Sequence, residues 1–343
     1  MKKLLNTLYV TTPEAYLSLD GENIVVRKDD DVLGRVPLHT LEGVVDFGRS
    51  GASPALMGAC AERGIDLCFF KPSGRFLARV QGETHGNVLV RRTQHRWADD
   101  AAQSLAIAKA FIIGKVYNEK WVIERTRRDH AARVNEGALS AASAQLTEYL
   151  HQLPACATME DLRGVEAVAA KAYFGVLDES ILGDKQHFAF HGRSRRPPLD
   201  RVNALLSFVY AMLARECASA LEGVGLDPYV GFMHEDRSGR ASLALDMMEE
   251  LRAPVADRFV LSLINRRMVD VKQFHIKEDG AVLLSDDARR ELLKAWQARK
   301  QEVLEHPYLG EKISWGLVPH AQALLLSRFV RGDLDGYPPF RWK

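Results

Sequence analysis

Residues 231–252 gather the side chains in this sequence that are best suited to chemistry. The segment reads GFMHEDRSGRASLALDMMEELR, and it combines one imidazole with several carboxylates. His234 precedes an expected helix, and Asp246 and Glu249 lie one turn apart on a shared face of that helix. An imidazole together with carboxylate oxygens suits Mn²⁺, or less ideally Mg²⁺. The alternative is a polar helix face in water with one loop histidine.

The helix that carries these carboxylates is expected to begin near Ser242 and to extend to about Arg252. A serine before an apolar periodic run is a favourable N-cap, and Gly239 interrupts the preceding segment. The helical period places one set of residues on the apolar side, namely Leu243, Met247, Met248 and Leu251. The opposite side carries Asp246, Glu249 and Glu250. Because Glu250 is next to Glu249, the pattern leaves open which of the two glutamates is the ligand.

Glu166 is a candidate third ligand from a different helix. If its segment is helical, the apolar residues around it are Leu162, Val165, Ala169 and Tyr173. A carboxylate on an apolar face needs a cation, a metal or a raised pKa, and an ion pair with a core arginine is the alternative to a site. Gly164 would leave room for another backbone or a ligand. Glu166, His234 and one carboxylate of the later helix then form a three-ligand set.

Basic residues surround this predicted set. The arginines nearest to it are Arg163, Arg240 and Arg252, and the loop 187–198 adds Arg193, Arg195 and Arg196. Loop arginines are good phosphate contacts, so we predict that these side chains bind the phosphate groups of a substrate. Between residues 91 and 133, Lys and Arg also outnumber the acids, which suits either a phosphate backbone or a solvated helix face. A metal beside such charges could neutralise a phosphodiester and activate an incoming oxygen.

The elements that must position these residues indicate an α+β protein. The 343 residues are enough for two domains, and 47% hydrophobic with 27% charged residues is an ordinary globular composition. Residues 1–85 contain short strands, a hairpin around residues 20–23 and one helix between residues 53 and 63. Residues 86–343 follow a helical period. We predict a small N-terminal β-rich domain, 1–85, and a larger all-helical catalytic domain, 86–343.

The remaining features exclude several classes of protein. The scattered cysteines lack zinc-site or disulfide-scaffold spacing, so we expect reduced core residues at Cys60, Cys68, Cys156 and Cys217. No apolar run reaches the roughly 18 residues of a membrane span, and the N-terminus lacks a signal-peptide pattern. We therefore expect a cytoplasmic protein without a membrane partner. The aromatic and proline-rich ending DGYPPFRWK is expected to dock on the protein.

These residues resemble a known family, the CRISPR-associated adaptation integrases that insert spacers into CRISPR arrays. The resemblance covers the whole chain and rests on three motifs. They are L-x-G-x-E at Leu162, Gly164 and Glu166, G-F-x-H at Gly231, Phe232 and His234, and S-L-x-x-D-x-x-E/D at Ser242, Leu243, Asp246 and Glu249. The tail around Tyr337–Phe340 is also similar, and the length resembles the type I-C version.

The resemblance implies roles for the site residues. It makes Glu166, His234 and Glu249 catalytic ligands of one divalent ion, Mn²⁺ or Mg²⁺, with Asp246 as a nearby supporting catalytic acid. Many members have Tyr before that aspartate, whereas this chain has Leu245, so a role of that tyrosine does not carry over. The resemblance also implies that the β domain forms a homodimer.

The implied activity is metal-dependent DNA endonuclease and integrase chemistry. A 3′-hydroxyl of a short protospacer duplex would attack a phosphodiester at the CRISPR repeat by transesterification. The implied partner is the small second CRISPR-associated protein, which would bridge two dimers. Two alternatives stay open: a non-catalytic scaffold that binds branched DNA, and a stand-alone repair nuclease that hydrolyses branched DNA.

Overall fold

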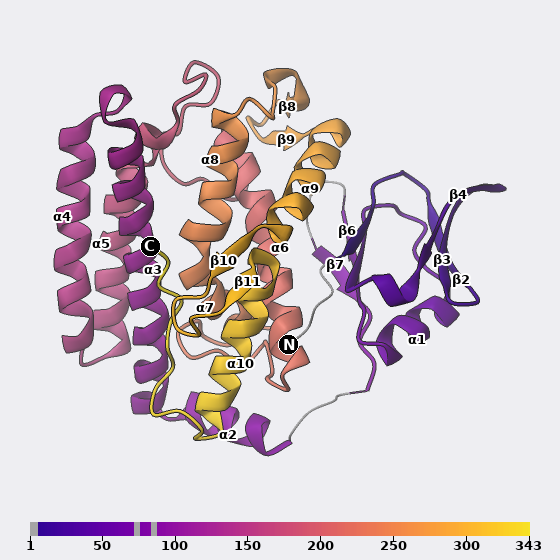
Figure 1. Cartoon of the computed structure of the whole chain (residues 1–343), viewed down its shortest axis with the longest axis horizontal. Coiled ribbons are helices and arrows are strands. Elements are labelled where there is room, and N and C mark those ends of the chain that lie inside the picture. Colours follow the sequence, from indigo (N-terminus) through magenta and orange to yellow (C-terminus); the bar gives the residue numbers. More distant parts are fainter. Residues whose placement is uncertain (1–5, 72–75, 84–87) are drawn as a thin grey trace. The chain divides into compact units, whose positions relative to one another are not determined.

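The chain divides into two compact units (Figure 1). The computed structural model describes residues 6–71, 76–83 and 88–343. The first unit combines Met1–His85 with Leu284–Glu302, and the second combines Gly86–Leu283 with Val303–Lys343. The predicted boundary between residues 85 and 86 lies outside the described residues. The sequence division assigned residues 284–302 to the helical domain, whereas in the structure they group with the first unit.

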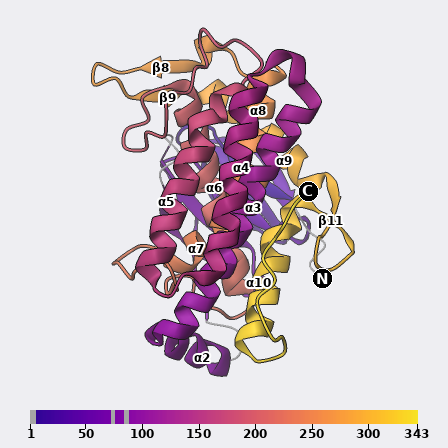
Figure 2. The same ribbon diagram turned by 90° about the vertical axis from the view of Figure 1, so that its left-hand side faces the viewer.

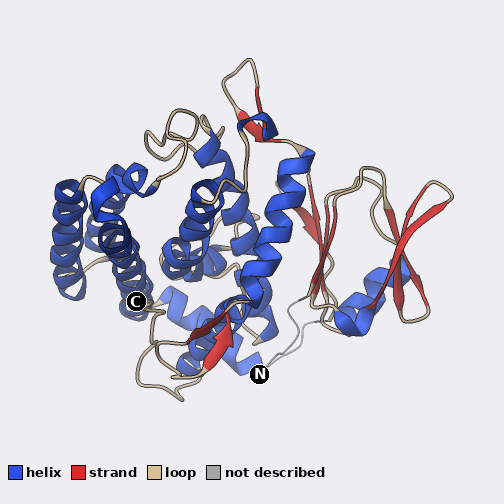
Figure 3. Cartoon of the chain, turned by 45° about the horizontal axis from the view of Figure 1, so that its top comes forward, coloured by secondary structure: helices blue, strands red, loops and turns tan. Residues whose placement is uncertain are grey.

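The first unit is built on two small sheets (Figure 3). One sheet has the order β1-β5-β6-β7, in which β6 pairs in parallel with β5 and antiparallel with β7. The other is an antiparallel sheet, β2-β3-β4. The strands are β1 (Thr7–Val10), β2 (Tyr16–Asp20), β3 (Asn23–Lys28), β4 (Asp31–Pro37), β5 (Gly43–Asp46), β6 (Asp66–Phe70) and β7 (Phe76–Arg79). Helices α1 (Pro54–Glu62) and α9 (Asp286–Gln301) complete the unit.

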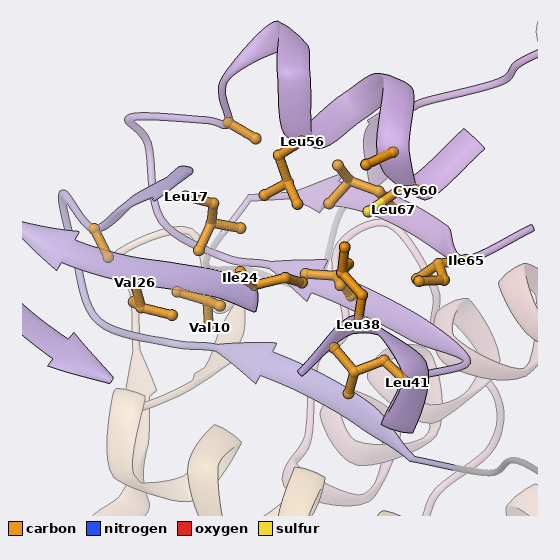
Figure 4. Packing of buried hydrophobic residues seen from close by; sticks show 14 residues of the cluster. Val10, Leu17, Ile24, Val26, Leu38, Leu41, Leu56, Cys60, Ile65 and Leu67 are labelled. Atoms are coloured by element: carbon orange, nitrogen blue, oxygen red, sulfur yellow. The ribbon is translucent and has the colours of Figure 1, made fainter. Parts of the chain in front are cut away.

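Local sequence signals explain the first unit. Asp20 pairs with Asn23, and Gly21 in the turn between them has a φ of 57°, so the predicted hairpin is confirmed. Ser53 accepts a hydrogen bond from the Leu56 N–H, which confirms the predicted cap of α1. Apolar side chains from both sheets and α1 meet in one core, which Figure 4 shows from close by.

The second unit is mostly helical (Figure 2). Its α-helices are α2 (Val88–Asp99), α3 (Ala101–His130), α4 (Glu136–Gln152), α5 (Met159–Val176), α6 (Arg201–Gly223), α7 (Ser242–Leu251), α8 (Arg258–Asn265) and α10 (Val318–Val330). The short strands β8 (Phe274–Ile276), β9 (Val282–Leu284), β10 (Val303–Glu305) and β11 (Lys312–Ser314) form two hairpins that the all-helical prediction omitted. The fold class, a β-rich region followed by a larger helical region, is confirmed.

Helix α3 is the centre of this unit, because α4, α5 and α7 all pack against it. Gly114 allows the contact with α7, since a Cβ there would lie 2.9 Å from the Glu250 Cβ and 3.0 Å from the Pro339 Cβ. The C-terminal tail is fixed from the same helix. The Asn118 side chain donates to the Phe340 carbonyl and accepts from the Trp342 N–H, which confirms that the tail docks.

Helix α6 is the core helix of the second unit. Its length and composition would also allow it to cross a membrane, but 72% of its apolar window is buried inside the structure. Core helices of globular proteins meet the same criteria. All four cysteines are free and buried, as predicted.

Candidate functional site

Three helices bring their charged residues to one point. The Lys115 ammonium of α3 contacts the Glu166 carboxylate of α5 and lies 2.9 Å from Glu249 Oε2 of α7. The side chains of Lys115 and Glu249 are only 4% and 5% exposed, whereas Glu166 keeps 22% of its side chain exposed. The predicted helix around Glu166 is present as α5, and its carboxylate is paired with a lysine rather than with a core arginine.

His234 is held beside this point by Asp246. The imidazole Nδ1 lies 2.6 Å from Asp246 Oδ1, and the fully buried carboxylate also accepts backbone N–H bonds from Phe232, Met233 and His234. A carboxylate that receives backbone donors acts as an acceptor, so we assign the ring proton to Nδ1. The lone pair then lies on Nε2, which is the arrangement of a metal-ligating histidine oriented by a carboxylate.

A glycine makes this tight loop possible. A Cβ at Gly231 would lie 2.7 Å from the Ser242 Cβ, 2.8 Å from the His234 carbonyl oxygen and 3.0 Å from Asp246 Oδ2. Real side chains do not tolerate contacts below 3 Å with backbone. The glycine of the G-F-x-H motif is therefore required for the loop to fold against α7.

The charges shift one another's pKa values. Burial raises the pKa of Glu249, but Arg252 and Lys115 outweigh it and lower the pKa to about 2. Burial alone would lower the pKa of Lys115, yet Glu249, Glu119 and Glu166 raise it overall. Glu119, one turn further along α3, is buried so deeply that its pKa is raised to about 8 despite Lys115. Three acids and two cations therefore form one cluster in which each charge affects the others. Its members are Glu119, Glu166, Glu249, Lys115 and Arg252.

The donor chemistry of the cluster fits a divalent ion. Glu249 Oε2 is buried, and it forms no hydrogen bond with any part of the chain that the structure describes. The Lys115 ammonium, 2.9 Å away, compensates the charge of this oxygen as an ion pair. Among residues 6–71, 76–83 and 88–343, no three His, Cys, Asp or Glu side chains stand in a ligating group. The Lys115 ammonium lies between the carboxylates of Glu166 and Glu249.

The helix α7 differs from the prediction in two respects. Ser242 is its first residue rather than its N-cap, because the hydroxyl donates to the Glu235 carbonyl of the preceding loop. The face that carries Asp246, Glu249 and Glu250 is buried, so the alternative of a polar face in water is wrong. Glu250 points elsewhere, since its oxygens accept hydrogen bonds from Gln322, Tyr337 and the Phe340 N–H.

Three of the predicted phosphate-binding arginines bind the protein itself. Arg163 donates to the Met233 carbonyl and pairs with Glu235, so it ties α5 to the loop of His234. Arg240 donates to the Glu235 carbonyl. Arg252 keeps 15% of its side chain exposed and forms an ion pair of 2.9 Å with Glu249, with its guanidinium over the Tyr210 ring.

The loop arginines differ among themselves. Arg193 is half-buried, donates to Asn203 and Ser207, and lies 5.1 Å from the centre of the Tyr210 ring, so it is not the exposed loop contact that we predicted. Arg195 and Arg196 are exposed. Gly164 is exposed too, and a Cβ there would meet nothing within 4 Å, so no other backbone approaches it.

Sequence reasoning missed Lys115 and Glu119. Both were counted in the basic stretch of residues 91–133, although Phe111, Ile112 and Val116 beside them are fully buried. The signal was the one that identified Glu166, a charge on an apolar helical face. Asp257 was also missed: it is buried and accepts hydrogen bonds from Tyr173 and Tyr210, and burial raises its pKa to about 6.

Comparison with known proteins relates the chain to one family. The profile of the family described as "CRISPR associated protein Cas1" matches residues 8–298. The chain is 50% identical over 343 residues to a CRISPR-associated endonuclease Cas1 of Chlorobaculum tepidum, and the match covers 100% of both chains.

Solved structures share the fold at low sequence identity. A casposase bound to its integration product superposes with a TM-score of 0.83 at 21% identity, covering 98% of this chain and 94% of that one. A chain of a Cas6-RT-Cas1–Cas2 complex gives a TM-score of 0.82 at 21% identity, covering 98% of this chain and 36% of that one.

Proposed function

Since this chain belongs to the Cas1 family of CRISPR-associated proteins, we propose that it is a metal-dependent DNA endonuclease and integrase of CRISPR adaptation. The reaction that we propose is a transesterification. The 3′-hydroxyl oxygen of a short DNA duplex forms a bond to a phosphorus at the CRISPR repeat and gives up its proton. The bond from that phosphorus to the leaving 3′-oxygen breaks, and the leaving oxygen takes up a proton to become a hydroxyl. Attack by water at the same phosphorus gives nuclease activity.

One observation carries this proposal. Carboxylates from two helices, Glu166 and Glu249, converge on a single cation. His234, whose imidazole Asp246 orients, lies close enough to contribute to the lowered pKa of Glu249. We propose that Glu166, His234 and Glu249 hold one Mn²⁺ or Mg²⁺. When bound, such an ion neutralises phosphodiester charge and lowers the pKa of an attacking hydroxyl.

The chain's own residues hold this arrangement together. Asp246 fixes the tautomer and orientation of His234, and Arg163 ties the loop of His234 to the helix of Glu166. Arg252 holds Glu249 from the other side. We propose that the exposed Arg195 and Arg196 bind the DNA backbone, whereas Arg163, Arg193, Arg240 and Arg252 act mainly by positioning the site.

The partners follow from the family. A neighbour in fold is part of a complex with Cas2, and another is bound to an integration product, so we propose DNA and the small second CRISPR-associated protein as partners. We also propose a homodimer through the first unit, where strand β4 at the edge of its sheet exposes Val32 and Leu33 at 47% and 51%. DNA of this kind is found in the cytoplasm, where we expect the protein to act.

The test is strand joining by the full chain with its small partner in Mn²⁺. We expect Glu166→Ala, His234→Ala and Glu249→Ala to lose joining while folding and DNA binding persist. Glu160→Ala on the same helix as Glu166 and His151→Ala on α4 are the matched controls, because both side chains are exposed. Retention of joining by all three site variants would refute the site.

The same assay separates the alternatives. A scaffold without activity would bind branched DNA with a strong salt dependence and would cleave nothing in any metal. A stand-alone repair nuclease would hydrolyse branched DNA and would not join an added 3′-hydroxyl end, with or without the small partner.

A further inference from the structure

Lys115 lies in the position that a cation bound to Glu166 and Glu249 would take. Its ammonium contacts the first carboxylate and lies 2.9 Å from the second. The cluster contains three carboxylates, including Glu119, and two cations, including Arg252. A divalent ion held by the same two carboxylates would meet the lysine charge at close range in a buried site, where such repulsion is strong. The lysine therefore has to move before such an ion can bind.

The structure contains a second place for this ammonium. Glu119 follows Lys115 by four residues on α3, a spacing that brings side chains of one helix face together. It is 3% exposed, and its Oε2 forms no hydrogen bond with the described residues of the chain. A buried carboxylate oxygen without a donor is costly, and Glu119 Oε2 is such an oxygen. In the present arrangement the ammonium pairs with Glu166 and Glu249 and leaves Glu119 Oε2 without a donor among the described residues.

We propose that Lys115 is a built-in competitor for the metal: it closes the site by bridging Glu166 and Glu249, and it moves to Glu119 when a divalent ion binds. This inference rests on the proposed metal site. It makes Lys115 and Glu119 positioning residues that set the metal affinity. The apparent dissociation constant of the ion is the intrinsic one divided by the fraction of molecules in which the lysine has left the site.

The test is calorimetric titration of the full chain with Mn²⁺ alone. We expect Lys115→Met to bind Mn²⁺ on the order of tenfold more tightly than the natural chain, because no ammonium has to be displaced. Glu119→Gln should bind Mn²⁺ on the order of tenfold more weakly, because the ammonium loses an acceptor that can become charged when the ammonium pairs with it. Lys120→Met, on the same helix beside Glu119 and half-buried, is the control and should leave the affinity unchanged.

The double variant separates relocation from a simple charge effect. If Glu119 acts by receiving the ammonium, Glu119→Gln should change the affinity of the Lys115→Met protein by less than about twofold. A loss as large as in the natural chain would overturn the relocation. Unchanged or weaker Mn²⁺ binding by Lys115→Met would overturn the competition. If Lys115→Met does not fold, the Glu119→Gln titration decides, because unchanged affinity there contradicts the proposal.

Glu166→Gln distinguishes this inference from the proposed function. Mn²⁺ binding that survives Glu166→Gln would mean that the metal site itself is wrong. Binding that depends on Glu166 but ignores Lys115 would overturn only the competitor. If the natural chain binds too weakly to measure, a Glu166-dependent site that appears in Lys115→Met supports the proposal, and no binding in either protein refutes it.

Discussion

Two neighbouring glutamates on α7 are both buried, yet their surroundings differ in kind. Glu250 receives neutral donors on both oxygens, from Gln322, Tyr337 and the Phe340 N–H. Glu249 faces two cations, Lys115 and Arg252, and keeps one oxygen without a hydrogen bond among the described residues. Both oxygens of Glu250 thus accept hydrogen bonds, and this carboxylate anchors the C-terminal tail. The charge of Glu249 is balanced by two cations, but one of its oxygens accepts no hydrogen bond from the described residues.

The pKa values express the same difference. Burial raises the pKa of Glu250 to about 7, since its neutral hydrogen-bond donors offset the burial only in part. Burial raises the pKa of Glu249 as well, but Arg252 and Lys115 lower it to about 2. Glu250, which anchors the tail, and Glu249, the proposed metal ligand, thus differ in their partners and not in their burial.

The largest expected effect comes from exchanging each glutamate for glutamine. We expect Glu249→Gln to lower the rate of strand joining in Mn²⁺ by at least about 100-fold, because a catalytic ion contributes several kcal/mol and about 1.4 kcal/mol is tenfold. Glu250→Gln is the matched control, buried on the same helix, and should keep joining per folded molecule. An equal loss of strand joining in both variants would contradict the prediction that only Glu249 takes part in the reaction.

A substitution of Asp246 tests whether the proposed metal site depends on the orientation of the His234 imidazole. Asp246→Asn keeps the size of the side chain but puts an amide where His234 Nδ1 and three backbone N–H groups now donate. We expect Mn²⁺ affinity and joining to fall about 10- to 100-fold, the usual cost of losing an orienting partner of a ligand. Calorimetry and a joining assay measure the two effects, and Asp236→Asn in the exposed loop is the control.

The contributions of Glu250 and Glu249 to the free energy of unfolding should change with pH in opposite directions. A raised folded pKa means that Glu250 favours folding below its unfolded pKa of 4.5 and loses this contribution as pH rises towards 7. We expect the free energy of unfolding, relative to Glu250→Gln, to fall by about 2 kcal/mol between pH 5 and pH 7. Glu249, with a lowered pKa, stabilises the fold above pH 4.5 and loses this only as pH falls towards 2. Denaturant unfolding of the three proteins at several pH values would measure both, and parallel curves would contradict the prediction.

Local signals in the sequence were sufficient for much of the fold. Ser53 and Pro54 located the start of α1, and the Asp20–Asn23 turn located a hairpin, because both depend on neighbours in the chain. Ser242 shows the limit, since its hydroxyl binds a carbonyl of the loop before it instead of capping the helix. The strands β8 to β11 have three residues each, too few for a period to be visible.

The site could be predicted only in part for a similar reason. The motifs identified Glu166, His234, Asp246 and Glu249. The structure packs α5 and α7 against α3, and Asp246 of α7 holds His234 of the preceding loop. The role of these residues stays a prediction. The burial of Lys115 was predictable from its apolar neighbours, but its partners were not, because they are set by how α3 packs against α5 and α7. The prediction that Arg163 and Arg252 face a phosphate differs from the structure, in which they contact the Met233 carbonyl and Glu249. The sequence gives the charge of an arginine but not the partner of its guanidinium.

The smallest effect comes from Tyr337, which touches only the structural member of the pair. Tyr337→Phe removes the hydroxyl that donates to Glu250 Oε1, while Gln322 continues to donate to the same oxygen at 3.0 Å. The carboxylate therefore loses one donor without becoming unsatisfied, so we expect a loss of about 1 kcal/mol in the free energy of unfolding. The Tyr337 hydrogen bond lowers the pKa of Glu250, so its removal should also move the pH-dependent loss of stability to higher pH. Strand joining should not change, because Glu249 keeps both its cations, and Tyr308→Phe, at an exposed tyrosine, controls for the substitution. A loss of joining in Tyr337→Phe without a loss of stability would show that the tail acts on the site through α7, and that the two glutamates are not independent.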